Sequence, residues 1–257
     1  MQNSNAKIVG NGLIAQAFYR CPIPDKTITI FASGVSNSSC VDPSEYERES
    51  LLLQSELKES RLLLYFSSFA IADPGLMNRP YFQHKAEIER VLLRSQKAVI
   101  LRLPNVVGPI PNPHTFVGYL HQCLLTGKKP DLWANALRYI IWVDDVTKIV
   151  QILVASEQPI HTVYSIGPTY SYTPLEVYSE LAFQMEMDFE YTLRPGDSIP
   201  YKHEDPNVQA IISKNPIFPN NRQDYLKRII ELYLKNSISK DGPYHEPLKG
   251  LPKPKTK

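Results

Sequence analysis

The sequence contains little cysteine, little net charge and no long apolar run. Its three cysteines, Cys21, Cys40 and Cys123, show no CxxC spacing, so we expect reduced thiols and neither a disulfide framework nor a zinc site. The six histidines are scattered along the chain, and no metal site is predicted. A formal charge of +2 over 257 residues is too small to indicate a surface that binds nucleic acid.

No apolar run approaches the roughly 18 residues of a membrane span, and the polar start of the chain does not resemble a signal peptide. These features predict a cytoplasmic protein without a membrane contact. The short basic stretch 249–257 is interpreted as a solvated end. The length and the apolar content of 43% allow one large core, or one core with a smaller lobe beside it.

Short apolar runs alternate with amphipathic helices, and this order predicts an α/β fold with a Rossmann-like, largely parallel sheet. The predicted strands are residues 7–9, 27–32, 61–66, 98–103, 139–143 and 163–166. The predicted helices are residues 13–19, 44–59, 80–95, 115–125, 146–156, 175–184 and 221–234. Residues 104–113 and 194–197 are predicted to lie in loops.

A glycine-rich turn, Gly10-Asn11-Gly12-Leu13-Ile14-Ala15, stands directly between the first strand and the first helix. Gly10 permits the tight turn, Gly12 lets the backbone approach a pyrophosphate, and Ala15 lets the helix lie near the sheet. The N–H groups at the start of the helix then face the phosphate charge. From these residues alone, a structural turn without a ligand is an equally good interpretation.

Tyr81 and Lys85 form a YxxxK pair at the start of a predicted helix, so both side chains lie on one face. A nearby ammonium favours the phenolate of a tyrosine, which suits proton transfer with a sugar hydroxyl. Ser68, at the end of the RLLLYFSS strand, could donate a second hydrogen bond. A packed tyrosine and a solvated lysine would explain the spacing alone. The order of the glycine-rich turn, the strand that ends in Ser68 and the YxxxK helix favours a catalytic role for these residues.

With these motifs in this order, the chain from about residue 7 to 234 resembles the extended short-chain dehydrogenases/reductases. This family contains sugar-nucleotide epimerases, dehydratases and keto-sugar reductases. Five stretches carry the resemblance: FASG at 31–34, YFSS at 65–68, LRLPNVVGP at 101–109, the RYIIWVDDV stretch at 138–146 and RPGD at 194–197.

The resemblance implies a catalytic set of Ser68, Tyr81 and Lys85, and NAD or NADP as cofactor. The implied cofactor contacts are Gly10, Asn11, Gly12, Leu13, Ile14, Ala32, Ser33, Gly34, Tyr81, Lys85 and Pro104. The implied contacts with a nucleotide-sugar substrate are Ser68, Asn105, Arg138 and Arg194. Guanidinium groups suit phosphate oxygens, which fits the two arginines. Asp144 and Asp145 are interpreted as caps and anchors of the next helix. Trp142 stands where the family usually has a histidine, and we interpret this difference as a change in packing.

The chain departs from the family pattern near its start. Residues 16–27 leave room for one crossover, but not for the additional strand–helix–strand unit that the family has there. The sheet is therefore predicted to lack two N-terminal strands. These normally supply the residue that reads the adenosine ribose, so the choice between NAD and NADP stays open. The interval between Ser68 and Tyr81 is also short.

A dinucleotide-binding region is predicted over residues 1–110 and about 139–168. A substrate-binding lobe is predicted over about 111–138 and 169–236, and a flexible tail over 237–257.

The favoured function is an NAD(P)-dependent reductase of a nucleotide-activated keto-sugar. A shortened cofactor site should exchange its cofactor readily, and a reductase must release its spent cofactor in every turnover. A role in polysaccharide synthesis would follow by family analogy. An epimerase of the same family and a non-catalytic Rossmann-like binding protein are the alternatives. A homodimer formed through helices 44–59 and 80–95 also stays open.

Overall fold

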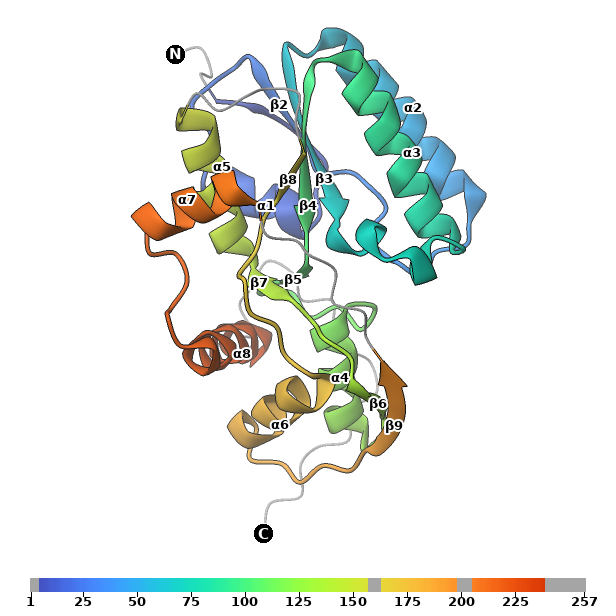
Figure 1. Ribbon diagram of the computed structural model, residues 1–257, viewed down its shortest axis with the longest axis vertical. Coiled ribbons are helices and arrows are strands. Elements are labelled where there is room, and N and C mark those ends of the chain that lie inside the picture. Colours follow the sequence, from blue (N-terminus) through green and yellow to red (C-terminus); the bar gives the residue numbers. More distant parts are fainter. Residues whose placement is uncertain (1–4, 157–162, 198–204, 239–257) are drawn as a thin grey trace.

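The computed structural model describes residues 5–156, 163–197 and 205–238 of the chain. A five-stranded parallel sheet forms its centre, in the order β1-β2-β3-β4-β8 (Figure 1). The strands are β1 (Lys7–Val9), β2 (Ile28–Phe31), β3 (Leu62–Ser68), β4 (Ala98–Leu103) and β8 (Val163–Ser165). The middle strands are rich in β-branched and large apolar residues and are buried on both faces, as parallel strands between helices require. The predicted α/β fold is confirmed.

Helices cover both faces of the sheet (Figure 1). One face carries α1 (Leu13–Arg20), α5 (Val143–Ala155) and α7 (Pro206–Lys214). Their apolar residues form one core with the sheet, Phe18, Ile149 and Val208 among them. The other face carries α2 (Pro43–Glu59) and α3 (Pro80–Ser95), whose Leu53, Ile88 and Leu92 pack on Tyr65 and its neighbours in a second cluster.

Among the described residues, strand β1 lies at the edge of the sheet and pairs with β2 alone. After α1 the chain returns through a short connection in which Ile23 O accepts a hydrogen bond from Ala6 N at 2.8 Å. It then enters β2 directly. The predicted absence of two strands on this side of the sheet is therefore confirmed, and the reason is the short segment between α1 and β2.

A second region with its own apolar core lies below the sheet (Figure 1). It contains α4 (Phe116–Thr126), α6 (Pro174–Gln184) and α8 (Arg222–Ile238). Two short parallel pairs accompany them, β5 (Asn105–Val107) with β7 (Ile140–Trp142), and β6 (Asp131–Asn135) with β9 (Thr192–Asp197). Among the described residues, no helix is long and apolar enough to cross a membrane.

Several predicted boundaries need correction. Arg194 and its RPGD neighbours do not form a loop but lie in β9, because the distant strand β6 supplies the backbone partners. The predicted loop 104–113 contains β5 near its start, because the distant strand β7 supplies its backbone partners. Helix α7 was not predicted, and the interval after Ser68 contains two 3₁₀ turns, η1 (Phe69–Ala72) and η2 (Pro74–Leu76). The predicted tail 237–257 lies outside the described residues beyond residue 238.

Candidate active site

The glycine turn between β1 and α1 has the geometry that the sequence predicts. Gly10 has a φ of +125°, and a Cβ there would lie 2.4 Å from the carbonyl oxygen of Ala32, so only glycine fits. Ala15 is fully buried where α1 approaches the sheet. A Cβ on Gly12 would meet nothing within 4 Å among the described residues. The turn therefore offers open space next to the first amides of α1, where a phosphate could lie.

The loop after β2 runs beside this turn. Ala32 N donates to Val9 O at 2.8 Å, which fixes the start of the loop against β1. The guanidinium of Arg48, from α2, donates to the carbonyl oxygen of Ser33 at 3.2 Å. Gly34 then reaches the YxxxK lysine, because a Cβ on Gly34 would lie 2.7 Å from Lys85 Nζ. The structure thus brings together the glycine turn, residues 32–34 and Lys85.

Tyr81 and Lys85 lie in the first two turns of α3, which begins with Pro80 at its first position. Both are buried, with 8% of Tyr81 and 2% of Lys85 exposed. Lys85 Nζ lies 5.8 Å from the centre of the Tyr81 ring. Its hydrogen bonds go elsewhere, to Glu49 Oε1 and to Tyr65 OH, each at 2.9 Å.

Glu49 is the residue of this site that sequence reasoning missed. It comes from α2, is fully buried, and accepts four hydrogen bonds. Oε1 accepts from Tyr65 OH at 2.7 Å and from Lys85, and Oε2 accepts from Val35 N at 2.7 Å and from His84 Nε2 at 3.1 Å. A carboxylate has about four acceptor positions, so this one is fully used.

A signal for Glu49 exists in the sequence. Tyr46, Glu49, Leu53 and Leu57 are spaced three or four residues apart, so they share the face of α2 that packs inward. A single carboxylate in such a stripe needs a buried partner. The sequence does not say that this partner is Lys85.

The environment of Glu49 lowers its pKa. Burial alone would raise it, but the hydrogen bond from His84, the charge of Lys85 and the hydrogen bond from Tyr65 together bring the pKa to about 2. Burial lowers the pKa of Lys85, and Glu49 opposes that change. Glu49 and Lys85 thus form a buried ion pair with no net charge.

Tyr81 differs from the prediction. Burial raises the pKa of its phenol, and the charge of Glu49 and the neighbouring Tyr46 raise it further. The sequence predicts that Lys85 favours the phenolate of Tyr81. In the structure the charge of Lys85 is balanced by Glu49, so Tyr81 is held as a neutral phenol.

Ser68 and Asn105 both lie at the carboxyl ends of neighbouring strands. Ser68 Oγ accepts from Ala70 N at 3.2 Å and so begins the η1 turn, which leaves its O–H group free to donate. Asn105 Nδ2 donates to Tyr139 O at 2.9 Å. Pro104 contacts the loop after β8, where a Cβ on Gly167 would lie 3.2 Å from Pro104 Cγ.

The two predicted phosphate ligands, Arg138 and Arg194, lie in the second region. Arg194 forms a two-point ion pair with Asp131, at 3.0 and 3.3 Å, and about half of its side chain is exposed. The guanidinium of Arg138 lies 5.7 Å from the centre of the Phe116 ring. Arg194 therefore already has a carboxylate as its partner.

Asp144 and Asp145 anchor α5 but do not cap it, which corrects one half of the prediction. The helix begins at Val143 with Trp142 as its N-cap, and no side chain caps it. Asp144 accepts from Trp142 Nε1 at 3.1 Å and pairs with Arg20 at 2.9 Å. Asp145 is buried and accepts from Tyr225 OH at 3.0 Å. Both therefore tie α5 to other elements.

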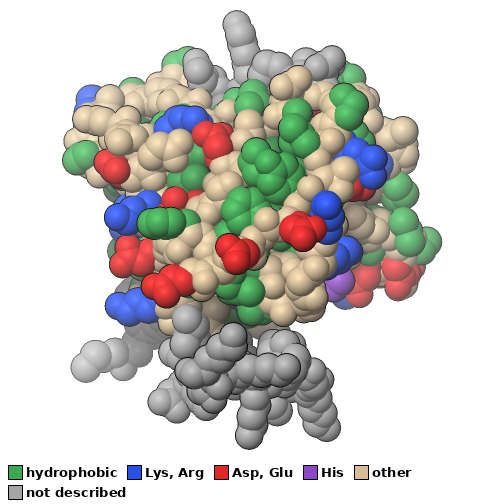
Figure 2. All heavy atoms as spheres, turned by 90° about the horizontal axis from the view of Figure 1, so that it is seen from below, with side chains coloured by type: hydrophobic (Ala, Val, Ile, Leu, Met, Phe, Trp, Pro, Cys, Tyr) green, Lys and Arg blue, Asp and Glu red, His purple; other side chains and the backbone are tan. Residues whose placement is uncertain are grey.

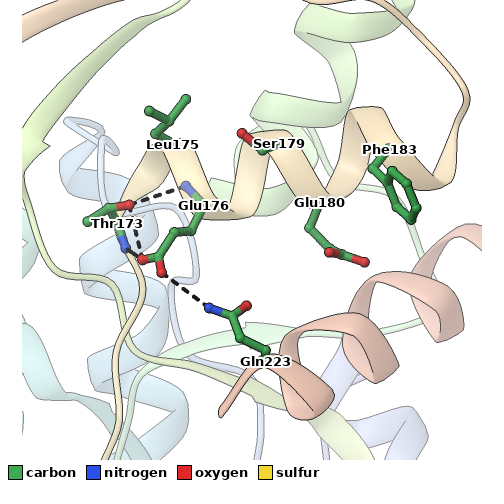
Figure 3. A pocket seen from close by; sticks show the side chains of 7 residues that line it. All are labelled: Thr173, Leu175, Glu176, Ser179, Glu180, Phe183 and Gln223. Carbon is green, nitrogen blue, oxygen red and sulfur yellow. Dashed lines mark hydrogen bonds between the residues drawn. The ribbon is translucent and has the colours of Figure 1, made fainter.

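Two cavities on the described surface are lined by residues outside the predicted catalytic set. One of about 360 Å³ lies beside β1 and α1. The other, of about 380 Å³, lies between α6 and α8 (Figure 3), in the region whose lower face mixes apolar, acidic and basic side chains (Figure 2). There Glu176 accepts from Thr173 and Gln223, and Glu180 lies beside them. Glu176 is also paired with Arg222, which balances its charge.

The comparisons with known proteins address the family and the fold. Residues 67–167 match the NAD dependent epimerase/dehydratase family. This segment contains Ser68, Tyr81 and Lys85, and the resemblance predicted from the sequence is confirmed over it. None of the curated proteins that were compared matches the chain.

Solved structures extend the likeness in fold to most of the chain. RMD from Pseudomonas aeruginosa, complexed with NADPH, has a TM-score of 0.66 at 16% identity, covering 89% of this chain and 97% of that one. dTDP-glucose 4,6-dehydratase from Bacillus anthracis, with NAD, scores 0.63 at 17% identity over 87% and 76%. UDP-glucose 4-epimerase from Thermus thermophilus, with NAD, scores 0.62 at 18% over 86% and 81%. These structures establish the Rossmann-like epimerase/dehydratase fold.

Proposed function

We propose that this chain is an NAD(P)-dependent oxidoreductase that reduces a nucleotide-activated keto-sugar. The observation that carries the proposal is the meeting of two motifs at one edge of the sheet. The open glycine turn contacts the loop 32–34, and that loop contacts Lys85 of the YxxxK helix. Ligands of open α/β sheets bind outside the carboxyl ends of the strands, which is where these motifs meet.

The residues of the turn fit a dinucleotide. The space next to Gly12 and the amides of α1 suit a pyrophosphate. The contacts assigned to NAD or NADP are Gly10, Asn11, Gly12, Leu13, Ile14, Ala32, Ser33, Gly34, Tyr81, Lys85 and Pro104. When bound in its reduced form, the cofactor would supply the hydride that converts a carbonyl carbon into an alcohol. The matched family and the solved structures described above support this assignment.

The side chains of the chain would then act on the sugar. Tyr81 transfers the hydroxyl proton, Ser68 donates a hydrogen bond to the reacting oxygen, and Lys85 holds the charge balance of the site. Asn105, Arg138 and Arg194 contact the nucleotide sugar, with the two arginines at the diphosphate. In this arrangement the five-stranded sheet holds the cofactor, and the second region holds the substrate.

Two observations bear on the alternatives. The edge position of β1 removes part of the adenosine site, so a cofactor should exchange readily, as a reductase needs and an epimerase does not. The pairing of Lys85 with Glu49 instead favours a second candidate, a protein that binds a dinucleotide or a sugar nucleotide without turning it over.

A titration with NADH and NADPH tests the proposal. Nicotinamide fluorescence and quenching of Trp142 should report binding and choose the cofactor. Tyr81→Phe should keep that binding and lose turnover of keto-sugar nucleotides by about 10²–10⁴-fold. Absence of binding at millimolar cofactor in a folded protein would refute the oxidoreductase. Binding without turnover across the keto-sugar nucleotides would favour the non-catalytic candidate.

A further inference from the structure

Lys85 Nζ lies over the ring of Tyr81, 5.8 Å from its centre, but its hydrogen bonds go to other groups. An ammonium has three donors, and two of them are taken by Glu49 Oε1 and Tyr65 OH at 2.9 Å. The backbone of Gly34 packs directly on this pair, because a Cβ there would lie 2.7 Å from Lys85 Nζ and 2.9 Å from Glu49 Oε1. The pair is thus enclosed by α2, β3, α3 and the loop after β2.

Glu49 itself is fixed in place. Its four hydrogen bonds come from β3, from α3 and from the loop after β2, and its side chain is 0% exposed. The ring of His84, which donates to it, packs against Tyr46 with 4.7 Å between ring centres. Because every acceptor position is used, the carboxylate has no second geometry in which it could release Lys85 without losing hydrogen bonds.

We propose that Glu49 is a positioning residue that fixes Lys85 Nζ and balances its charge beside Tyr81, so that Tyr81 is a protonated phenol before reduction begins. This inference rests on the proposed function and deepens it, because it assigns the residue that sets the protonation state of the proton donor. It also explains why the same chain can retain YxxxK while its lysine is bound to a carboxylate.

The proton transfer can be written in full. The O–H bond of Tyr81 would break, and its proton would form the new O–H bond of the sugar, while a bound reduced cofactor would supply the hydride to the carbonyl carbon. Tyr81 is left as a phenolate and takes a proton from water before the next turnover. The reverse reaction would use the phenolate of Tyr81 as its base, so balancing the charge of Lys85 would move the oxidation to higher pH and leave the equilibrium unchanged.

The groups around Tyr81 and its lysine come from several elements, and each enters the balance of charge. Helix α2 contributes Tyr46, Arg48 and Glu49, and α3 contributes Lys85 and Glu89. Two more, Tyr65 on β3 and His84 on α3, bind Glu49, and Cys40 lies in the loop next to Tyr46. Glu89 is itself paired with Arg102 at 2.6 Å, so Glu49 is the carboxylate that balances Lys85.

The test is a ¹³C NMR titration of protein labelled at tyrosine Cζ, without cofactor. Tyr81→Phe assigns the Tyr81 resonance. In the wild-type protein Tyr81 should titrate above the usual tyrosine pKa of about 10. In Glu49→Gln the unbalanced ammonium should lower the pKa of Tyr81 by about one pH unit or more. The double variant E49Q/K85M removes both charges and should return the pKa to the wild-type value.

Glu89→Gln is the matched control, since it removes another buried carboxylate of α3 and should leave the Tyr81 titration in place. An unchanged pKa in E49Q would overturn the inference, and so would a lowered pKa that persists in the double variant. If E49Q does not fold, Gly34→Ala is used in its place, because its Cβ must displace Lys85 Nζ and Glu49 Oε1.

A second readout separates this inference from the proposed function. In the active enzyme, E49Q should lower the apparent pKa of the oxidative reaction, while Tyr81 stays protonated at neutral pH and can still donate its proton in the reductive reaction. The NMR titration needs no cofactor, so it decides the role of Glu49 even if NADH and NADPH fail to bind. Failure to bind would refute the oxidoreductase alone, and an unchanged Tyr81 titration would refute the positioning role alone.

Discussion

At the glycine turn, a Cβ added to Gly12 would meet no atom of the described residues within 4 Å, whereas one added to Gly34 would lie 2.7 Å from Lys85 Nζ. Both glycines belong to the predicted cofactor site. In the proposed site, the end assigned to the phosphates is formed by backbone and left open, and the end assigned to catalysis is filled by the buried Glu49–Lys85 ion pair. The comparison indicates that binding at the turn and proton chemistry at Tyr81 depend on different physical features, which separate variants can disturb.

The largest effect is expected from Lys85→Met. It leaves the Glu49 carboxylate buried without its ammonium, and breaking a buried pair in this way costs about 3–5 kcal/mol. Urea unfolding at neutral pH measures the loss. The double variant E49Q/K85M should recover most of it, because removing both partners of a buried pair is often neutral. A loss below about 1 kcal/mol in K85M would mean that the pair is not closed to water.

Acid should destabilise the buried Glu49–Lys85 pair before it affects the glycine turn. The pKa of Glu49 is about 2 in the folded protein, below the unfolded value of about 4.3. A lowered carboxyl pKa stabilises the fold fully above the unfolded pKa, and that stability is lost as the pH falls towards 2. The difference in unfolding free energy between wild type and E49Q should therefore shrink from about pH 4 downwards. Urea titrations at several pH values check this, and a constant difference would contradict it.

Gly12→Val should disturb the glycine turn and leave the Glu49–Lys85 pair unchanged. The backbone of Gly12, with φ of −72° and ψ of −173°, suits any residue. The protein should therefore lose no more than about 1 kcal/mol, the cost of a poorer N-cap. NADH or NADPH should bind at least about tenfold more weakly, which is about 1.4 kcal/mol. Fluorescence titration and thermal unfolding measure the two effects, and unchanged binding would move the phosphate site away from this turn.

The smallest effect is expected at an exposed pair in the second region. Arg194→Ala breaks the ion pair with Asp131, and about half of each side chain is exposed. Exposed pairs contribute about 0.2–1 kcal/mol, so stability should hardly change. If Arg194 contacts a nucleotide diphosphate, Asp131→Asn should strengthen the binding of such a ligand and R194A should weaken it. Calorimetry with a nucleoside diphosphate measures this binding, and weaker binding in D131N or unchanged binding in R194A would contradict the prediction.

Features that depend on neighbouring residues could be predicted from the sequence. The apolar runs give the strands of the parallel sheet, and the start of α3 at Pro80 agrees with the prediction. The count of residues between α1 and β2 gives the missing strands, because a chain of this length cannot form the extra unit. Gly10 and Ala15 follow from the local geometry of a strand–turn–helix, and the structure has them as predicted.

Contacts between distant segments were decided by the tertiary structure alone. The strand β9 exists because β6, about 60 residues earlier, pairs with it, so RPGD read as a loop in the sequence. The i,i+4 spacing places Tyr81 and Lys85 on one face of α3, but it does not say which charge lies opposite. Glu49 is 36 residues before Lys85 and Tyr65 is 20 before it, and only the packing of α2 and α3 on β3 brings them together. The sequence by itself determined the local motifs of the proposed site, the glycine turn and the YxxxK pair. The tertiary structure determined that Glu49 joins them, and with it the environment of Tyr81, because the pKa of a buried group depends on its neighbours in space.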